Sequence, residues 1–140
     1  MGSIADHKRR IQENIEEIES TVAVGIEKKP VTMGMHVSAC SVELLELYLH
    51  KTGKIPIGKV IKHDWFKRPL PGQKVEPMIE RKLKADFLRK EEIYDLLYTI
   101  EENRNNLIYG RATKHQVELV FNSFMKLREI LTGLAGDLYD

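Results

Sequence analysis

The sequence has little of what secreted, membrane-spanning and disulfide-bonded proteins use. It contains one cysteine, Cys40, which excludes an intrachain disulfide and is typical of a reducing compartment. No apolar run approaches the roughly 18–20 residues that a helix needs to cross a bilayer. The beginning of the chain does not resemble a signal peptide, because the basic residues 7–10 lead into an acidic amphipathic stretch. We therefore expect a cytoplasmic protein with no membrane contact.

The sequence also lacks the patterns of common catalytic classes. Gly53, Gly58 and Gly72 are too scattered for a phosphate-binding loop, and no serine or cysteine has the setting of a nucleophile. His36 and Cys40 are four residues apart, but a metal site needs further ligands at consistent spacing, and we find none. We read them as a histidine at the edge of the core and a buried thiol. No metal ion and no cofactor are expected.

What the sequence does contain is sufficient for one globular domain over residues 1–140, since 42% of its residues are hydrophobic and 31% are charged. The charge is uneven. Residues 54–90 carry eleven Lys or Arg against four Asp or Glu, whereas the segments on either side are net acidic. A basic middle can attract an anionic partner such as RNA or an acidic protein surface, or it can be an ordinary solvated surface.

Apolar residues recur at helical spacing in most of the chain, and strand-like alternation does not persist. The section over residues 54–77 holds four of the five prolines, so we expect it to be irregular, with one short helix near residues 60–66. Thr113 and Gln116 form a capping box that opens the last helix. The expected helices cover residues 4–26, 32–53, 77–90, 91–109 and a segment after Thr113. The sequence predicts an all-α, up-and-down bundle of four long helices plus short pieces.

Four polar residues, Asn103 to Asn106, interrupt the apolar stripe of the helix over 91–109. Asn103 follows Ile100 by three residues, where the stripe predicts an apolar side chain, and Arg104 lies beside the same stripe. Burying an amide or a guanidinium without partners is costly, so the cluster indicates a polar network or an interface cleft. The same asparagines could instead end the helix before Gly110. Spacing alone leaves both interpretations open.

The segment Arg104-Asn-Asn-Leu-Ile-Tyr-Gly110 resembles the signature of HEPN domains (higher eukaryotes and prokaryotes nucleotide-binding). That signature is an arginine, usually with a polar residue next, followed after a short spacer by a histidine at the end of a late helix. Residues 39–53 also look like the second helix of the family. The resemblance implies a homodimeric helical bundle with both motifs in one cleft. Active members are metal-independent ribonucleases of toxin–antitoxin and defence systems, and others bind RNA or nucleotides or accompany a nucleotidyltransferase.

Carried onto this chain, the resemblance implies that Arg104 holds a phosphate with its permanently charged guanidinium and that Asn105 helps to orient it. Tyr109 stands where the family has histidine, and a tyrosine with a pKa of about 10 exchanges a proton poorly near neutrality. His115 comes six residues later, at a spacing that does not match the signature. We therefore expect weak or no ribonuclease activity, which favours a role in binding.

The basic section offers further candidate contacts to RNA. Trp65 and Phe66 lie among cations, and an aromatic ring in such a setting can stack on an unpaired base. The same pair could instead pin the loop onto the bundle. The residues that we expect to contact a ligand are Asn105, Arg111, His115, Lys62, Trp65, Lys67 and Arg68. Two alternatives are a non-catalytic protein-interaction bundle that partners a nucleotidyltransferase, and a weak metal-independent ribonuclease that uses Arg104 with Tyr109 or His115.

Overall fold

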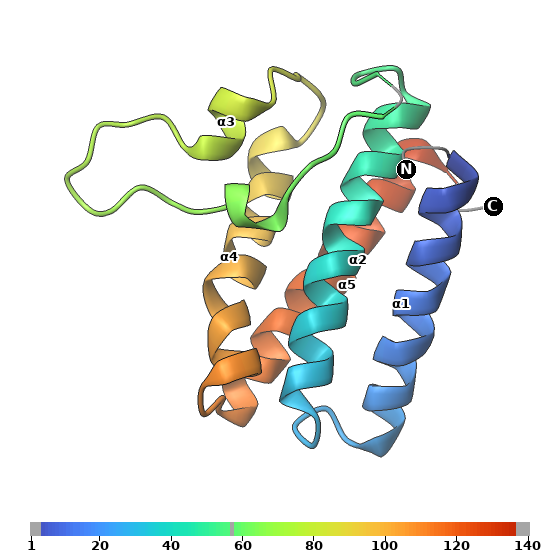
Figure 1. Ribbon diagram of the computed structural model, residues 1–140, viewed down its shortest axis with the longest axis vertical. Coiled ribbons are helices and arrows are strands. Elements are labelled where there is room, and N and C mark those ends of the chain that lie inside the picture. The colour runs from blue at the N-terminus through green and yellow to red at the C-terminus, as the bar shows by residue number, and fades with distance from the viewer. Residues whose placement is uncertain (1–3, 57, 137–140) are drawn as a thin grey trace.

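Four long helices run alternately up and down and pack side by side in the computed structural model, which describes residues 4–56 and 58–136 (Figure 1). The elements are α1 (Ile4–Val24), α2 (Pro30–Lys51), the 3₁₀ helix η1 (His63–Trp65), α3 (Met78–Lys82), α4 (Lys90–Tyr109) and α5 (Lys114–Ala135). The described residues contain no strand, so the predicted all-α bundle is confirmed. None of the helices described is long and apolar enough to cross a membrane.

The central element of the bundle is α2, which packs against α1, α4 and α5. From Leu44 to His50 every residue of α2 is buried, because Ile55 and Ile61, which follow α2 in the chain, cover the side that the three helices leave open. A helix that is enclosed all round also encloses its polar residues. Glu46 and His50 are therefore buried among leucines, and this enclosure positions the polar groups described below.

Local residues account for the starts of α2 and α5. Pro30 stands in the first turn of α2, where its missing N–H costs nothing. The predicted capping box is confirmed: the hydroxyl of Thr113 accepts a hydrogen bond from the N–H of Gln116, and the Gln116 side chain accepts one from the Thr113 N–H.

The helix predicted over residues 77–90 is wrong, because only Met78–Lys82 is helical. After α3 the chain is extended and buries every second residue, namely Leu83, Ala85 and Phe87, whereas Leu88 is 72% exposed. Arg89 then takes a left-handed conformation, with φ of 59°, and α4 begins at Lys90. Residues 83–87 therefore alternate between buried and exposed, as in a strand, and do not follow the helical period that the apolar spacing indicated.

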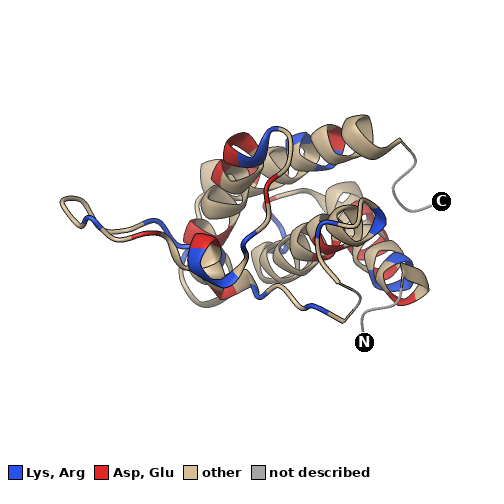
Figure 2. Cartoon of the chain, turned by 90° about the horizontal axis from the view of Figure 1, so that it is seen from above, with Lys and Arg blue, Asp and Glu red and all other residues tan. Residues whose placement is uncertain are grey.

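The section between α2 and α3 crosses α4 and then extends away from the bundle as an arm over residues 67–77 (Figure 2). Phe66 anchors the base of the arm: it is 1% exposed and packs edge-on against Tyr94 and Tyr98. Arg68 fastens the same region to α4 through salt bridges with Asp95 and Glu102. The aromatic residue Phe66 thus pins this section to the bundle, as one of the two interpretations of the sequence expected.

Gly34 lets α2 and α4 approach each other closely. A Cβ atom at this position would lie 2.9 Å from Cβ of Leu107 and 3.1 Å from Cγ1 of Ile108. Relieving such contacts requires α4 to shift, since Cβ of Leu107 is fixed by its own backbone. We expect Gly34→Ala to lower the free energy of unfolding by about 1–3 kcal/mol, measured by urea denaturation.

Gly133 provides the matched control, because a Cβ atom there would have no heavy atom within 4 Å. Gly133→Ala should leave the stability unchanged or raise it by up to about 1 kcal/mol. If Gly34→Ala is as stable as Gly133→Ala, the close packing of α2 on α4 is not a constraint on this fold.

Candidate functional site

Arg104 lies on the face of α4 that packs along α2. Glu101, one turn before it, bonds Ser38 of α2, and Ile108, one turn after it, lies against Gly34. The Arg104 side chain is half-buried, and its Nε is fully buried without a hydrogen-bond partner. Within the described part of the chain, no hydrogen bond or salt bridge reaches its guanidinium. The guanidinium is held in place by packing and is not neutralised by a direct partner.

Glu101, whose charge interacts with that of Arg104, is already engaged by other partners. Its Oε1 lies 2.8 Å from Nδ1 of His63, and its Oε2 accepts a weak hydrogen bond of 3.5 Å from the Ser38 hydroxyl. Burial raises the pKa of Glu101, and the contacts with His63 and the charge of Arg104 oppose that rise. Glu101 thus joins η1 to α2 and α4 while it interacts with Arg104 only over a longer range.

Two of the asparagines beside Arg104 make hydrogen bonds within the chain. Asn103 donates from Nδ2 to the Thr99 carbonyl at 2.8 Å, and Asn106 donates from Nδ2 to Oε1 of Gln116 at 2.6 Å. The second contact ties the last turn of α4 to the capping box of α5. The helix-end interpretation therefore fits Asn106, whereas Asn103 bonds one turn back inside α4. Asn105 is exposed, and Arg104 takes no part in these contacts.

The structure does not bring Arg104 and Tyr109 together within one chain. Five residues of an α-helix correspond to a rotation of roughly 140° beyond a full turn, so the two side chains leave α4 in different directions. Tyr109 is 79% exposed. Arg111 and His115 are also exposed and lie in and just after the connection from α4 to α5, at the same end of the bundle as Tyr109.

The candidates in the basic section fall into two groups. Arg68 is bound to Asp95 at 2.5 Å and to Glu102, and its guanidinium carbon lies 5.2 Å from the centre of the Tyr98 ring. It would have to give up these contacts to bind a phosphate. Trp65 is half-buried against the core. Lys62 and Lys67 are exposed and remain accessible to a ligand.

A groove of about 920 Å³ lies between α1, α2 and the segment that contains η1. Six of the fifteen residues that line it are Asp or Glu, and two are Lys or Arg. Lys62 and His63 stand on one wall, so the groove comes close to the Glu101 contact. Its charge favours a cation over a phosphate. The sequence did not predict this groove, because its walls come from three separate segments.

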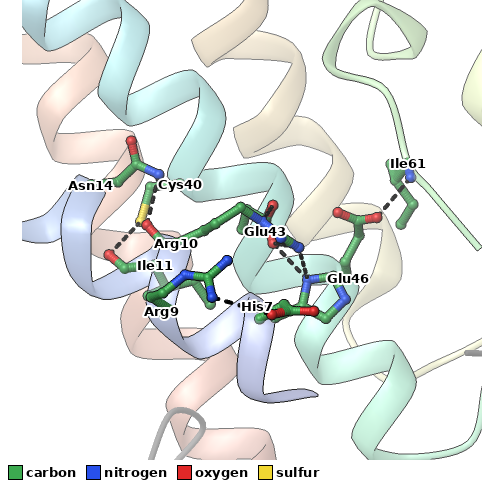
Figure 3. Close-up of polar contacts among 10 residues, drawn as sticks. His7, Arg9, Arg10, Ile11, Asn14, Cys40, Glu43, Glu46 and Ile61 are labelled. Atoms are coloured by element: carbon green, nitrogen blue, oxygen red, sulfur yellow. Dashed lines mark hydrogen bonds and ion pairs between the residues drawn. The ribbon is translucent and has the colours of Figure 1, made fainter. Parts of the chain in front are cut away.

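A second polar cluster lies between α1 and α2, beside this groove (Figure 3). Nδ1 of His7 lies 2.6 Å from Oε2 of Glu43, and Nε of Arg10 donates to Oε1 of the same carboxylate at 2.6 Å. Oε2 of Glu46 accepts a hydrogen bond of 2.9 Å from the Ile61 N–H. The rings of His7 and His50 stack with centroids 5.0 Å apart. Sequence reasoning missed this cluster, although Glu43, Glu46 and His50 have the spacing of one helix face.

His36 and Cys40 do not form a site together. His36 lies at the edge of the core with its Nδ1 2.8 Å from Oδ1 of Asn14, and the Cys40 thiol points toward the Ile11 carbonyl at 4.0 Å. Cys40 is fully buried, and burial raises the pKa of its thiol to about 12.

The comparisons with known proteins give no relative on which to base a function. No protein-family model matches the chain, and neither a curated protein nor a solved structure is similar to it. The function is therefore inferred from the residues and their geometry.

Cys40 gives a direct check on the packing of α1 against α2. We expect no reaction of the folded protein with a thiol reagent such as DTNB at neutral pH, because the thiolate is both buried and scarce. In denaturant, the same chain should release one equivalent of chromophore, since it has one cysteine. Rapid stoichiometric reaction of the folded protein would contradict the packing described here.

Proposed function

We propose that this chain is a HEPN-like bundle that binds RNA or a nucleotide as a homodimer, with Arg104 as the phosphate ligand and without cleavage of the family type. One observation supports it most. The other partly buried arginines of the described chain, Arg10, Arg68 and Arg128, all have partners, whereas Arg104 has neither a hydrogen bond nor a salt bridge.

An unpaired, half-buried guanidinium is costly for the folded protein, because it loses part of its hydration and gains no direct partner. A phosphate restores what is missing, since its oxygens accept charge-assisted hydrogen bonds from the planar donors of arginine. Glu101 does not supply this partner, because it is bonded to His63 and Ser38. An anion bound at Arg104 would therefore stabilise the folded protein.

The exposed polar groups near the motif suggest the path of a longer ligand. Asn105, Arg111 and His115 are exposed on the last turns of α4, the connection to α5 and the first turn of α5. The groove between α1 and α2 is predominantly acidic and would repel a phosphate backbone. We expect RNA to run over the end of α4, with Lys62 and Lys67 as more distant contacts.

A second copy of the chain has an apolar surface to cover at the same end of the bundle. Val31 and Met35, on the first turns of α2, are 46% and 50% exposed, and Tyr109 at the end of α4 is 79% exposed. They flank the contact between Gly34 and Ile108, in which the two helices approach closely. A homodimer formed here would bring the two Arg104 side chains toward one another, as the resemblance implies.

The proposal favours binding over catalysis because of Tyr109. It replaces the histidine of the signature, and its direction on α4 differs from that of Arg104. The resemblance further implies a place in a toxin–antitoxin or defence module, beside a nucleotidyltransferase. Weak metal-independent ribonuclease activity would then require a proton carrier from elsewhere, such as His115.

One observation favours a second candidate function, that of a protein-interaction bundle. The arm over residues 67–77 extends from the bundle, and its Leu70 and Val75 are 62% and 57% exposed (Figure 2). A protein partner such as the nucleotidyltransferase could cover these side chains. The contacts of Asn103 and Asn106 lie within their own chain, so they do not support a register-fixing role between chains.

The test is the binding of a short fluorescent single-stranded RNA, followed by anisotropy at several salt concentrations in EDTA. Arg104→Ala should weaken binding at least about tenfold, because it removes a charge-assisted contact, and should lower the slope of log K against log salt by about one. Arg9→Ala is the matched control, since it removes an equal charge from an exposed position on α1. It should change the affinity less than about twofold.

Two results would overturn the proposal. One is equal affinity of the wild-type protein and Arg104→Ala, with both folded by circular dichroism. The other is no saturable binding of RNA or mononucleotides by the wild-type protein. Cleavage of the RNA in EDTA that disappears in Arg104→Ala would instead support the ribonuclease alternative.

A further inference from the structure

The cluster around His7 contains more buried polar groups than hydrogen bonds can account for. The exposed fractions of His7, Glu46 and His50 are 1%, 5% and 7%. Nε2 of His7 is buried without a hydrogen-bond partner, whereas the His50 ring interacts with the backbone of Ile55 and Lys59. Buried polar atoms normally have partners, so the orphaned nitrogen of His7 is unusual.

In the part of the chain that the structure describes, one of the two carboxylates in this cluster has no cationic partner. Arg10 neutralises Glu43, with its Nε 2.6 Å from Oε1. Glu46 receives only the Ile61 N–H, and no salt bridge within the described residues reaches it. Burial raises the pKa of Glu46 to about 7, which means that the site disfavours a second negative charge in the absence of a further cation.

The donor atoms converge on one point. A ring nitrogen of His7 and one carboxylate oxygen each from Glu43 and Glu46 all lie within 4.8 Å of one another. An ion about 2.0–2.2 Å from each donor would draw them to roughly 3–3.5 Å apart, a change that rotations of the two glutamate side chains can supply. The donors belong to α1 and α2, which pack along their lengths, so the backbone that carries them is fixed.

We propose that His7, Glu43 and Glu46 bind a divalent first-row transition-metal ion such as Zn²⁺, with the remaining coordination position open toward the neighbouring groove. This inference is independent of the proposed phosphate site at Arg104, which involves different helices and an anionic ligand. It also differs from the sequence analysis, in which no metal ion was expected.

The chemistry of the donors selects the class of ion. One imidazole with two carboxylates suits Zn²⁺, Mn²⁺, Fe²⁺ and Co²⁺, whereas Mg²⁺ and Ca²⁺ prefer oxygen ligands alone. With Arg10 included, the two carboxylates leave a net charge of −1, so a divalent ion brings the site to +1. A metal ion binds the ionised form of Glu46, whose pKa burial raises to about 7, so binding releases a proton to solvent.

The surroundings already provide the supporting contacts that metal ligands need. Arg10 donates to Oε1 of Glu43 at 2.6 Å and only weakly to Oε2 at 3.4 Å, so Oε2 is the oxygen more available to the ion, and the Ile61 N–H orients Glu46. Burial and the nearby His7 lower the pKa of His50, so this neighbour is a neutral imidazole that does not repel a cation. Glu43 and Glu46 also line the groove of about 920 Å³, which gives the ion a path from solvent.

The test uses the full chain, stripped of metal with a chelator and titrated with Zn²⁺ by calorimetry. We expect one ion per chain, a rise in melting temperature with Zn²⁺ and release of protons. A parallel titration with Co²⁺ should give the intense visible absorption of a low-coordinate site with a nitrogen ligand. Absence of saturable binding by the wild-type chain would overturn the proposal by itself.

Two variants localise the ion. Glu46→Gln should weaken Zn²⁺ binding by more than about a hundredfold, since it removes a direct ligand. Glu17→Gln is the matched control, because Glu17 lines the same groove, is exposed and makes the same change in charge. It should change the affinity less than about threefold. Equal losses in the two variants would mean diffuse attraction to an acidic surface, and equal affinity of Glu46→Gln and wild type would exclude the assigned ligand.

If Glu46→Gln does not fold, His7→Gln serves in its place, since it removes the imidazole near the start of α1 and keeps a polar side chain. It should abolish the Co²⁺ absorption that depends on the nitrogen ligand. Retention of the full wild-type absorption in a folded His7→Gln protein would overturn the proposal.

Discussion

The enclosure of α2 between Leu44 and His50 is the constraint on which the rest of the structure depends. Three helices together with Ile55 and Ile61 surround this stretch, so each polar group on it must find a partner inside the protein. The hydrogen bond from Ile61 to Glu46 and the stacking of His7 on His50 both follow from this enclosure.

The two sides of α2 differ in charge, and this difference separates the two proposed ligands. On the side of α1, carboxylates outnumber permanent cations along the groove, and an orphaned imidazole nitrogen lies among them. On the side of α4, Arg104 is half-buried without a direct partner. The groove beside α1 favours a cation and the Arg104 side favours an anion. One bundle can therefore hold a metal ion and a phosphate without competition between them.

The sequence predicted the helices well where the local signals agreed. The Thr113 capping box and the apolar stripes located four long helices, although α2 begins at Pro30, two residues before the expected start. The prediction failed at residues 77–90, because Ile79, Leu83 and Phe87 fit a helical stripe as well as an extended segment that buries every second residue. The site was harder to predict. Arg68 meets Asp95 and Glu102, which are 27 and 34 residues away, and the His7 cluster forms only when α1 packs on α2. No spacing rule reveals such partners.

The most direct test of the central claim, that Arg104 is an anion-binding side chain, is the NMR signal of its Nε–H. The Nε is buried, so its proton should exchange slowly enough to observe, and the spectrum of Arg104→Lys identifies it. We predict that this signal shifts saturably as single-stranded RNA is added, whereas the Nε–H signal of Arg10, which is bonded to Glu43, stays in place. RNA binding that leaves the Arg104 signal unmoved would contradict the account.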